Sequence, residues 1–248
     1  MTSSQRLKVA YLLPNLFTAG SIFLAILAVV AASAGQFERA FWLVVLSAVF
    51  DALDGRVARM TQTTSQFGKE FDSLADVIAF GMTPAFIFYF AIGQQFGKLG
   101  ILVCALYVIF GAVRLARFNI TANDTEPNVF IGLPIPAAAL LVVSWVLFWH
   151  QEIATWASAG VLLGVVAAVS ILMVSNIRYP SFKQIDFGKT YYLKALVGLI
   201  VLFSLFYLYP TWFLPIVALL YALIGPLRAL WTLLRKAKKG QHSDDTTD

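Results

Sequence analysis

Eight long apolar runs divide the sequence, and they limit its possible folds more than any other feature. They cover residues 16–34, 38–58, 71–92, 99–118, 133–149, 155–176, 192–209 and 211–231. Each is close to the roughly 20 residues that a helix needs to cross the hydrocarbon core of a bilayer. Strand-like alternation is absent, and lipid offers no hydrogen-bond partners to open strand edges. We therefore predict an all-α integral membrane protein with about eight transmembrane helices.

The composition agrees with this class of protein. The chain is 60% hydrophobic and 12% charged, and its mean hydropathy is +0.80. We expect residues 1–236 to form a single transmembrane domain and residues 237–248 to form a polar, disordered cytoplasmic tail. The only cysteine, Cys104, lies in an apolar run, so no disulfide can form within the chain and redox chemistry is not favoured.

The basic residues indicate an orientation. If the eight runs alternate in direction, all of the 18 Lys and Arg residues except Arg39 and Lys98 fall on one side. The positive-inside rule makes that side cytoplasmic, with both termini there. We expect a multi-pass protein of the cell inner (cytoplasmic) membrane. In such a protein the basic pI of about 9.4 indicates contact with anionic membrane phospholipids and not with nucleic acid.

Four aspartates stand out in the stretch "DALDGRVARMTQTTSQFGKEFDSLAD". Asp51 and Asp54 are three residues apart near the end of the second run, so they share one helix face. Asp72 and Asp76 are four residues apart at the start of the third run, again on one face. The short polar linker makes the two helices antiparallel neighbours. The four carboxylates can then converge just inside the interface that we predict to be cytoplasmic.

Such a carboxylate cluster needs compensation. A charged side chain at the centre of a membrane helix costs roughly 2.5–3.5 kcal/mol, and like charges repel one another. Carboxylates without Cys or His ligands favour hard divalent ions, Mg²⁺ or Mn²⁺. Two such ions suit phosphoryl chemistry. The alternative is that these aspartates cap helices or pair with Arg56, Arg59 and Lys69, which fits four aspartates with intervening glycines less well.

Small and basic residues surround the aspartates. Gly55 and Ala58 leave room for a ligand beside the helix, and Gly68 clears the turn before the second aspartate pair. Arg59 provides a fixed cation of the kind that binds phosphate. Ser65 is placed either to cap the third helix or to contact a phosphate.

The whole pattern, D-x2-D-G-x2-A-R-x8-G-x3-D-x3-D, resembles the motif of the CDP-alcohol phosphatidyltransferases. Its fixed positions are filled by Asp51, Asp54, Gly55, Ala58, Arg59, Gly68, Asp72 and Asp76. Further stretches resemble the bacterial phosphatidylserine synthase branch of that family. They are "PNLFTAG" at 14–20, "RLARFN" at 114–119, "FIGLPIPAAA" at 130–139 and "SNIRYPSFK" at 175–183.

The resemblance implies a site with two divalent ions, Mg²⁺ or Mn²⁺. Asp51 would bridge both ions, Asp54 would bind one, and Asp72 would bridge. Asp76 would contact the second ion and act as the general base, which makes it the predicted catalytic residue. The site would lie at the cytoplasmic mouth of a helical cavity.

The resemblance also implies a lipid donor, CDP-diacylglycerol. Members of the family are commonly dimers, so the resemblance implies a homodimer as well. Gly55, Arg59 and Ser65 would contact the CDP part of the donor. Asn15 and Thr18 would approach it from the first helix.

The implied reaction joins CDP-diacylglycerol to L-serine and yields phosphatidylserine and CMP. A carboxylate that accepts the serine hydroxyl proton contributes about 10²–10⁴-fold to the rate. Bound ions stabilise charge on the CMP leaving group. The residues leave both direct attack and a phosphatidyl-enzyme open. We favour direct attack, because no Ser, Cys or His is paired with a base in the motif.

Four residues are candidates for binding the serine. Arg114 and Arg117 end the fourth run on the predicted cytoplasmic side, and an arginine fork suits a carboxylate. Asn119 could add a hydrogen bond, and Arg178 enters after the sixth run. The alternative is that these residues are interfacial anchors that set the topology.

Two rival functions remain open at this point. A transferase of the same family could use another acceptor, glycerol 3-phosphate or an inositol phosphate, which would demand more basic residues near the cavity. A cation transporter would need acidic or polar residues deep within several spans. Here the acids gather at one end of the spans, which favours the enzyme.

Overall fold

The computed structural model describes residues 3–60, 65–121, 129–180, 198, 200, 204–205 and 208–244. Its helices are α1 (Ser3–Ser33), α2 (Phe37–Met60), α3 (Gln66–Asp76), η1 (Val77–Met82), α4 (Thr83–Ala91), η2 (Gly93–Phe96), α5 (Lys98–Thr121), α6 (Ile135–Phe148), η3 (Trp149–Ile153), α7 (Trp156–Val174) and α9 (Pro210–Asp244). Two short strands, β1 (Val129–Ile131) and β2 (Arg178–Pro180), complete the described elements.

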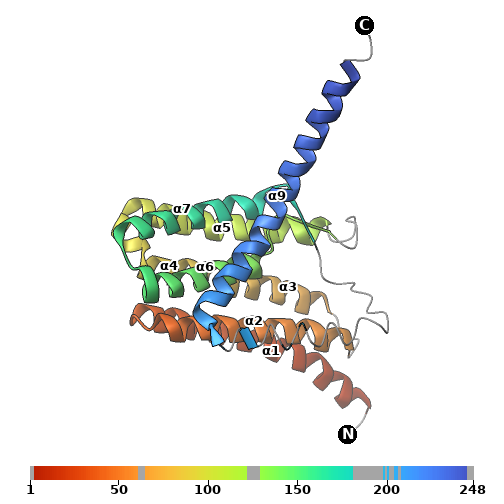
Figure 1. Cartoon of the computed structure of the whole chain (residues 1–248). Coiled ribbons are helices and arrows are strands. Elements are labelled where there is room, and N and C mark those ends of the chain that lie inside the picture. The colour runs from red at the N-terminus through yellow and green to blue at the C-terminus, as the bar shows by residue number, and fades with distance from the viewer. Residues whose placement is uncertain are drawn as a thin grey trace.

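The helices form a bundle of roughly parallel rods (Figure 1). The pair α1 and α2 packs along one side of the bundle, and the pair α5 and α7 packs along the other. Between them lie α3, α4 and α6. Helix α9 packs on α6, crosses the bundle and projects beyond it toward the C-terminus.

Six helical segments within the described part of the chain are long and apolar enough to span a membrane. They are Pro14–Ser33, Gln66–Ala91, Lys98–Thr121, Ile135–Ile153, Trp156–Val174 and Thr211–Trp231. The prediction of an all-α membrane protein is therefore confirmed. Helix α2 matches the predicted run 38–58. It is not among these six segments, and it carries the charged residues of the aspartate motif. The predicted run 192–209 lies mostly outside the described residues. Residues 237–244, which were predicted to begin a disordered tail, are helical and continue α9.

The two ends of the bundle differ in their polar residues. At one end the turn between α1 and α2 lies beside η3, and the ring of Phe37 meets that of His150 with centroids 4.9 Å apart. The aspartate motif and the C-terminal ends of α5 and α7 lie at the other end. The described helices thus alternate in direction, which is what the predicted orientation assumes.

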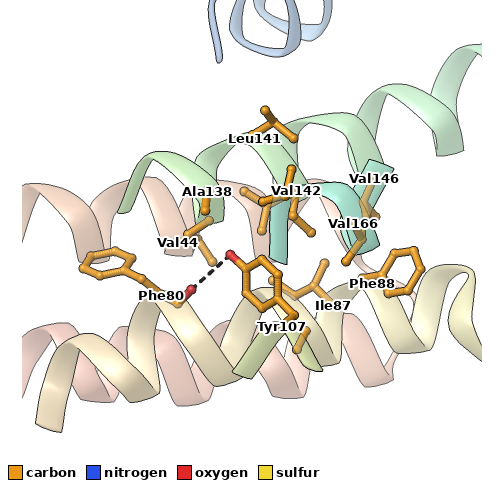
Figure 2. Packing of buried hydrophobic residues seen from close by; sticks show 14 of the residues in the cluster. Val44, Phe80, Ile87, Phe88, Tyr107, Ala138, Leu141, Val142, Val146 and Val166 are labelled. Carbon is orange, nitrogen blue, oxygen red and sulfur yellow. Dashed lines mark hydrogen bonds between the residues drawn. The ribbon is translucent and has the colours of Figure 1, made fainter. Parts of the chain in front are cut away.

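Buried apolar side chains fill the space between α2, α4, α5, α6 and α7 (Figure 2). Val44, Phe88 and Val142 belong to this core and are fully buried. Small residues allow helices to approach closely. A Cβ at Gly100 would lie only 2.0 Å from the Gly93 carbonyl oxygen, so the start of α5 packs directly against the backbone of η2.

The short antiparallel ribbon was not predicted. Strands β1 and β2 pair in the register Val129↔Pro180, Phe130↔Tyr179 and Ile131↔Arg178. The ribbon joins the segment before α6 to the segment after α7. The hydroxyl of Tyr179 donates a 3.0 Å hydrogen bond to the carbonyl of Ala222, which ties the ribbon to α9.

The third predicted span also differs from its expected form. It begins at Gln66, five residues before the predicted start, because Ser65 caps its first turn. Eleven residues after this start, directly after Asp76, the helix changes from α to π over Val77–Met82 and returns to α at Thr83. The π turn directly follows an aspartate of the motif.

Candidate active site

Three of the four motif aspartates meet in the structure. Helix α2 brings Asp51 and helix α3 brings Asp72 and Asp76, and one carboxylate oxygen of each lies within 4.8 Å of the others. The chain reverses direction between α2 and α3. The face of α2 that carries Asp51 therefore lies opposite the face of α3 that carries Asp72 and Asp76. Three like charges at this distance favour cations between them. The sequence prediction that α2 and α3 converge through their aspartates is thus met for these three.

The fourth aspartate is turned toward α1. Asp54 is buried, and its Oδ2 accepts a 2.7 Å hydrogen bond from the hydroxyl of Thr18. The Thr18 hydroxyl also lies 3.2 Å from the Pro14 carbonyl oxygen. Asp54 is therefore held by a donor from a neighbouring helix that the motif itself does not contain.

A pocket of about 610 Å³ opens beside the aspartates, between α1, α2 and the start of α3. Its walls are formed by Pro14, Asn15, Thr18, Asp54, Gly55, Ala58, Arg59, Ser65, Gln66, Gly68, Lys69, Glu70 and Asp72. All five residues predicted to contact the lipid donor are among them. Asp54 and Asp72 face the same pocket, so it adjoins the acidic cluster directly.

The floor of the pocket is shaped by the first turn of α3. Ser65 Oγ accepts a 2.9 Å hydrogen bond from the backbone N–H of Gly68, so the predicted cap is confirmed. A Cβ at Gly68 would lie 3.1 Å from Ser65 Oγ and 3.4 Å from Asn15 Oδ1. Glycine at this position keeps both polar atoms accessible at close range.

Two buried side-chain polar atoms in the described part of the chain have no hydrogen-bond partner: Asp76 Oδ1 and Arg114 Nε. Buried polar groups are normally satisfied, so such atoms point to a missing ligand. The charges of these two side chains interact with each other. The Arg114 guanidinium also lies 5.4 Å above the centre of the Phe118 ring.

The acidic cluster therefore fits divalent ions. Its donors are carboxylate oxygens, the ligand type that Mg²⁺ and Mn²⁺ prefer. The unpartnered oxygen of Asp76 lies in the same cluster. Asp51, Asp72 and Asp76 are the residues that the structure brings close enough to share an ion.

The other predicted acceptor residues lie in different surroundings. Arg117 uses its two terminal nitrogens to contact five oxygens at 3.0–3.4 Å, those of Ile131, Met173, Val174, Ser175 and Asn176. Its guanidinium thus holds the end of α7 and strand β1 together. Arg178 lies on β2 and is exposed. Neither residue lines the pocket beside the aspartates.

Asn119 is placed closer to the acidic cluster. Its Nδ2 donates a 2.9 Å hydrogen bond to the hydroxyl of Ser73, which stands between Asp72 and Asp76 on α3. Ser73 in turn donates to the carbonyl of Lys69 at 3.0 Å. The end of α5 is therefore joined to the helix that carries two of the aspartates.

Sequence reasoning missed part of the pocket wall. Pro14, Gln66 and Glu70 line the pocket but were not singled out, and Lys69 was considered only as an ion-pair partner of the aspartates. The helical period offered a signal, because Lys69 follows Ser65 by four residues and Gln66 by three. Pro14 could be recognised only from the position of α1 in the fold.

Comparison with known proteins gives a consistent result. The family model described as CDP-alcohol phosphatidyltransferase matches residues 11–173. A CDP-diacylglycerol–serine O-phosphatidyltransferase of Helicobacter pylori is 48% identical over 91% of this chain and 94% of its own length. An archaetidylserine synthase of Methanothermobacter thermautotrophicus is 38% identical over 68% of this chain and 69% of its own length.

A solved structure shares the fold. The Mycobacterium tuberculosis phosphatidylinositol phosphate synthase, crystallised with CDP-DAG bound, aligns with a TM-score of 0.51 at 19% sequence identity. The alignment covers 66% of this chain and 82% of that one. The likeness supports the helical arrangement described above.

Proposed function

The chain belongs to the CDP-alcohol phosphatidyltransferase family, and from this premise we propose that it transfers a phosphatidyl group from CDP-diacylglycerol to the hydroxyl of L-serine. The products are phosphatidylserine and CMP. One observation carries the proposal: the Asp51–Asp72–Asp76 cluster adjoins a 610 Å³ pocket that contains every residue expected to contact the donor. Serine as the acceptor is supported by the 48% identical relative.

The pocket suits the nucleotide part of the donor. Its volume of about 610 Å³ lies within the roughly 300–1,000 Å³ of small-ligand sites. Arg59 and Lys69 offer cations to the diphosphate, and Gly55 and Gly68 allow it to approach the backbone. The acyl chains of the donor would remain in the lipid beside the bundle. Binding therefore needs no extraction of the lipid from the membrane.

The metal site is assigned to the four motif aspartates. Asp51, Asp72 and Asp76 would hold two Mg²⁺ or Mn²⁺ ions, and Asp54 would reach one of them from the pocket wall. When bound, such ions neutralise the diphosphate and stabilise the charge that develops on CMP. The chain itself supplies the shape of the cluster, since α2 and α3 hold the carboxylates within 4.8 Å.

Asp76 is the proposed general base. Its Oδ1 is buried and has no hydrogen-bond partner, so it is available to accept the proton of an acceptor hydroxyl. General-base catalysis of this kind contributes about 10²–10⁴-fold. As the proton leaves, the serine oxygen attacks the β-phosphorus and the bond to CMP breaks. We propose direct attack, because the two serines of the motif segment are engaged with backbone groups: Ser65 Oγ accepts from the Gly68 N–H and the Ser73 hydroxyl donates to the Lys69 carbonyl.

Arg114 is the proposed contact for the serine carboxylate. It is buried, its Nε has no partner, and its charge interacts with that of Asp76. A ligand that carries a carboxylate and a hydroxyl could therefore reach both side chains. Asn119 is a second candidate, through the Ser73 hydroxyl that it contacts. For Arg117 and Arg178 the described contacts favour a role in the ribbon region.

The proposed location is the cell inner membrane, with the pocket open to the cytoplasm. The support is the charge pattern: Arg59, Lys69, Arg114 and Arg117 all lie at the pocket end of the bundle, while Arg39 lies at the opposite end. The homodimer that the family resemblance implies stays a prediction.

The acceptor is tested by identifying the lipid product. The purified chain is incubated with CDP-diacylglycerol, Mn²⁺ and one of three acceptors: L-serine, glycerol 3-phosphate or inositol phosphate. Mass spectrometry is expected to find phosphatidylserine in the first reaction alone. A lipid phosphate product from one of the other acceptors would keep the family and change the substrate. No product from any acceptor, with folded protein, would contradict the proposal.

A further inference from the structure

The third membrane span contains a break in its α-helical pattern directly after the proposed general base. Helix α3 ends at Asp76, the π-helix η1 runs over Val77–Met82, and α4 begins at Thr83. π-Helical turns are rare and occur frequently at functional sites. The position of this turn therefore raises the question of whether it affects the orientation of Asp76.

The cause of the turn lies in the sequence. In an uninterrupted α-helix the carbonyl of Phe80 would accept a hydrogen bond from the N–H of residue 84, and Pro84 has none. Its ring would also clash with that carbonyl. The backbone N–H of Thr83 instead reaches back five residues to the carbonyl of Ile78, as a π-helix requires.

Side chains from other positions stabilise the turn. The hydroxyl of Tyr107 on α5 donates a 3.2 Å hydrogen bond to the Phe80 carbonyl, which supplies the donor that Pro84 lacks (Figure 2). Tyr107 and Phe80 are fully buried, so no water can replace this bond. The Thr83 hydroxyl lies 3.0 Å from the Ile78 oxygen and contacts α1 through the Ala25 oxygen at 3.5 Å.

The π turn changes which face of the helix is exposed in each half of the third span. Before it, Phe67 and Leu74 are exposed at a spacing of seven residues. After it, Met82 and Phe86 are exposed, whereas Gly81 and Ala85, which would continue the α-helical spacing, are buried. The exposed stripe therefore slips by one residue across η1. One residue corresponds to a rotation of about 100°.

This rotation links packing to the site. The half of the span after η1 is fixed by the core through residues such as Ile87 and Phe88, which are fully buried. Without the extra residue, α3 would be rotated relative to that fixed half, and Asp76 would turn away from Asp51 on α2, together with Asp72 on the same helix. We propose that the π turn, held by Tyr107, sets the rotation of Asp76 into the acidic cluster, which makes Tyr107 a positioning residue.

The inference rests on the proposed function for the role of Asp76, and its test separates the two. The full-length protein in detergent is compared with its Tyr107→Phe variant for serine-dependent CMP release and for Mn²⁺ binding followed by electron paramagnetic resonance. Mn²⁺ titration reads the geometry of the cluster without turnover. Tyr107→Phe is expected to lower kcat by about 10–100-fold, as small displacements of reacting groups do. It should also weaken Mn²⁺ binding.

The matched control is Tyr179→Phe. Tyr179 is also a buried tyrosine whose hydroxyl donates to a backbone carbonyl, that of Ala222, but it is not next to η1. Burial raises the pKa of Tyr179 to about 12, so it remains a donor under assay conditions. A merely structural role predicts equal effects of the two variants. The inference predicts that Tyr179→Phe keeps the wild-type kcat and Mn²⁺ affinity.

A second variant, Pro84→Ala, covers the case in which Tyr107→Phe does not fold. It gives residue 84 an N–H that competes with Tyr107 for the Phe80 carbonyl and favours the α register. We expect lower kcat and weaker Mn²⁺ binding. Wild-type values in either folded variant, or equal losses in Tyr107→Phe and Tyr179→Phe, would overturn the inference. A wild-type protein that binds Mn²⁺ but releases no CMP would instead refute the proposed function.

Discussion

The hydroxyl of Thr18 lies 2.7 Å from Asp54 Oδ2 and donates a hydrogen bond to it. This bond joins α1 to the first half of the aspartate motif and holds Asp54 at the wall of the donor pocket, which Asp72 also lines. It also explains how one motif can serve two tasks. Three aspartates form a cluster, while the fourth shapes the wall where the diphosphate is proposed to bind.

Replacing Thr18 by valine removes this bond with little change in volume. Hydrogen bonds to charged groups contribute about 1.5–3 kcal/mol, so we expect the KM for CDP-diacylglycerol to rise about tenfold or more. The KM for serine should not change. The control is Ser21→Ala, because the hydroxyls of Ser21 and Ser47 join the same two helices at 2.8 Å outside the pocket. Equal donor KM values in Thr18→Val and wild type would remove Thr18 from the donor site.

Gly68→Ala tests the floor of the pocket. The added methyl group would lie 3.1 Å from Ser65 Oγ and 3.4 Å from Asn15 Oδ1, where the diphosphate is proposed to approach. We expect weaker binding of CDP-diacylglycerol in a direct binding assay. Gly160→Ala on α7 is the control, since no atom of the described residues outside its own helical turn lies within 4 Å of the added methyl group. That variant should bind the donor normally and be slightly more stable, by about 0.5–1 kcal/mol. Unchanged donor affinity in Gly68→Ala would contradict the assigned binding surface.

Arg114→Lys tests recognition of the acceptor carboxylate. Lysine keeps the charge but loses the planar fork, so the KM for serine should rise while the KM for CDP-diacylglycerol stays constant. A comparison with ethanolamine, which lacks the carboxylate, sharpens the test. The wild type should prefer serine strongly, and Arg114→Lys should reduce that preference. If the variant lowers the rates with both amines equally, Arg114 supports the fold and does not select the acceptor.

Arg117→Ala should affect stability and not serine binding. Its guanidinium contacts carbonyl oxygens at the end of α7, so its loss leaves the half-buried carbonyls of Met173, Val174 and Ser175 without this donor. Each such loss costs about 1–3 kcal/mol. Thermal unfolding in detergent should therefore begin at a lower temperature, with an unchanged KM for serine in the folded fraction. A raised serine KM at unchanged stability would return Arg117 to the acceptor site.

The sequence was sufficient to predict what depends on local spacing. The apolar runs indicate the helices, and the three- and four-residue spacings of the aspartates place them on facing helix sides. The cap at Ser65 follows from its place before a helix. The residues expected to contact the donor line one pocket because most of them belong to the same helix–linker–helix segment.

Features that depend on distant contacts were not predictable in this way. Asp54 is held by the hydroxyl of Thr18, which is 36 residues away in the chain. The Arg117 guanidinium donates hydrogen bonds to carbonyls that are up to 58 residues away in the chain. The π turn requires both Pro84 and a donor from α5, and neither residue alone distinguishes a π turn from a simple kink. Only the packed structure brings these pairs together.

The central claim is metal-dependent phosphatidyl transfer at the aspartate cluster. It is tested most directly by CMP release from CDP-diacylglycerol in the presence of serine and Mn²⁺, for the wild type and Asp76→Asn. We predict release that requires serine, that stops on addition of a chelator and that returns with excess Mn²⁺. In Asp76→Asn it should fall by at least about 10²-fold, the contribution of a general base. Serine-dependent release that persists in Asp76→Asn or in chelator would contradict the account.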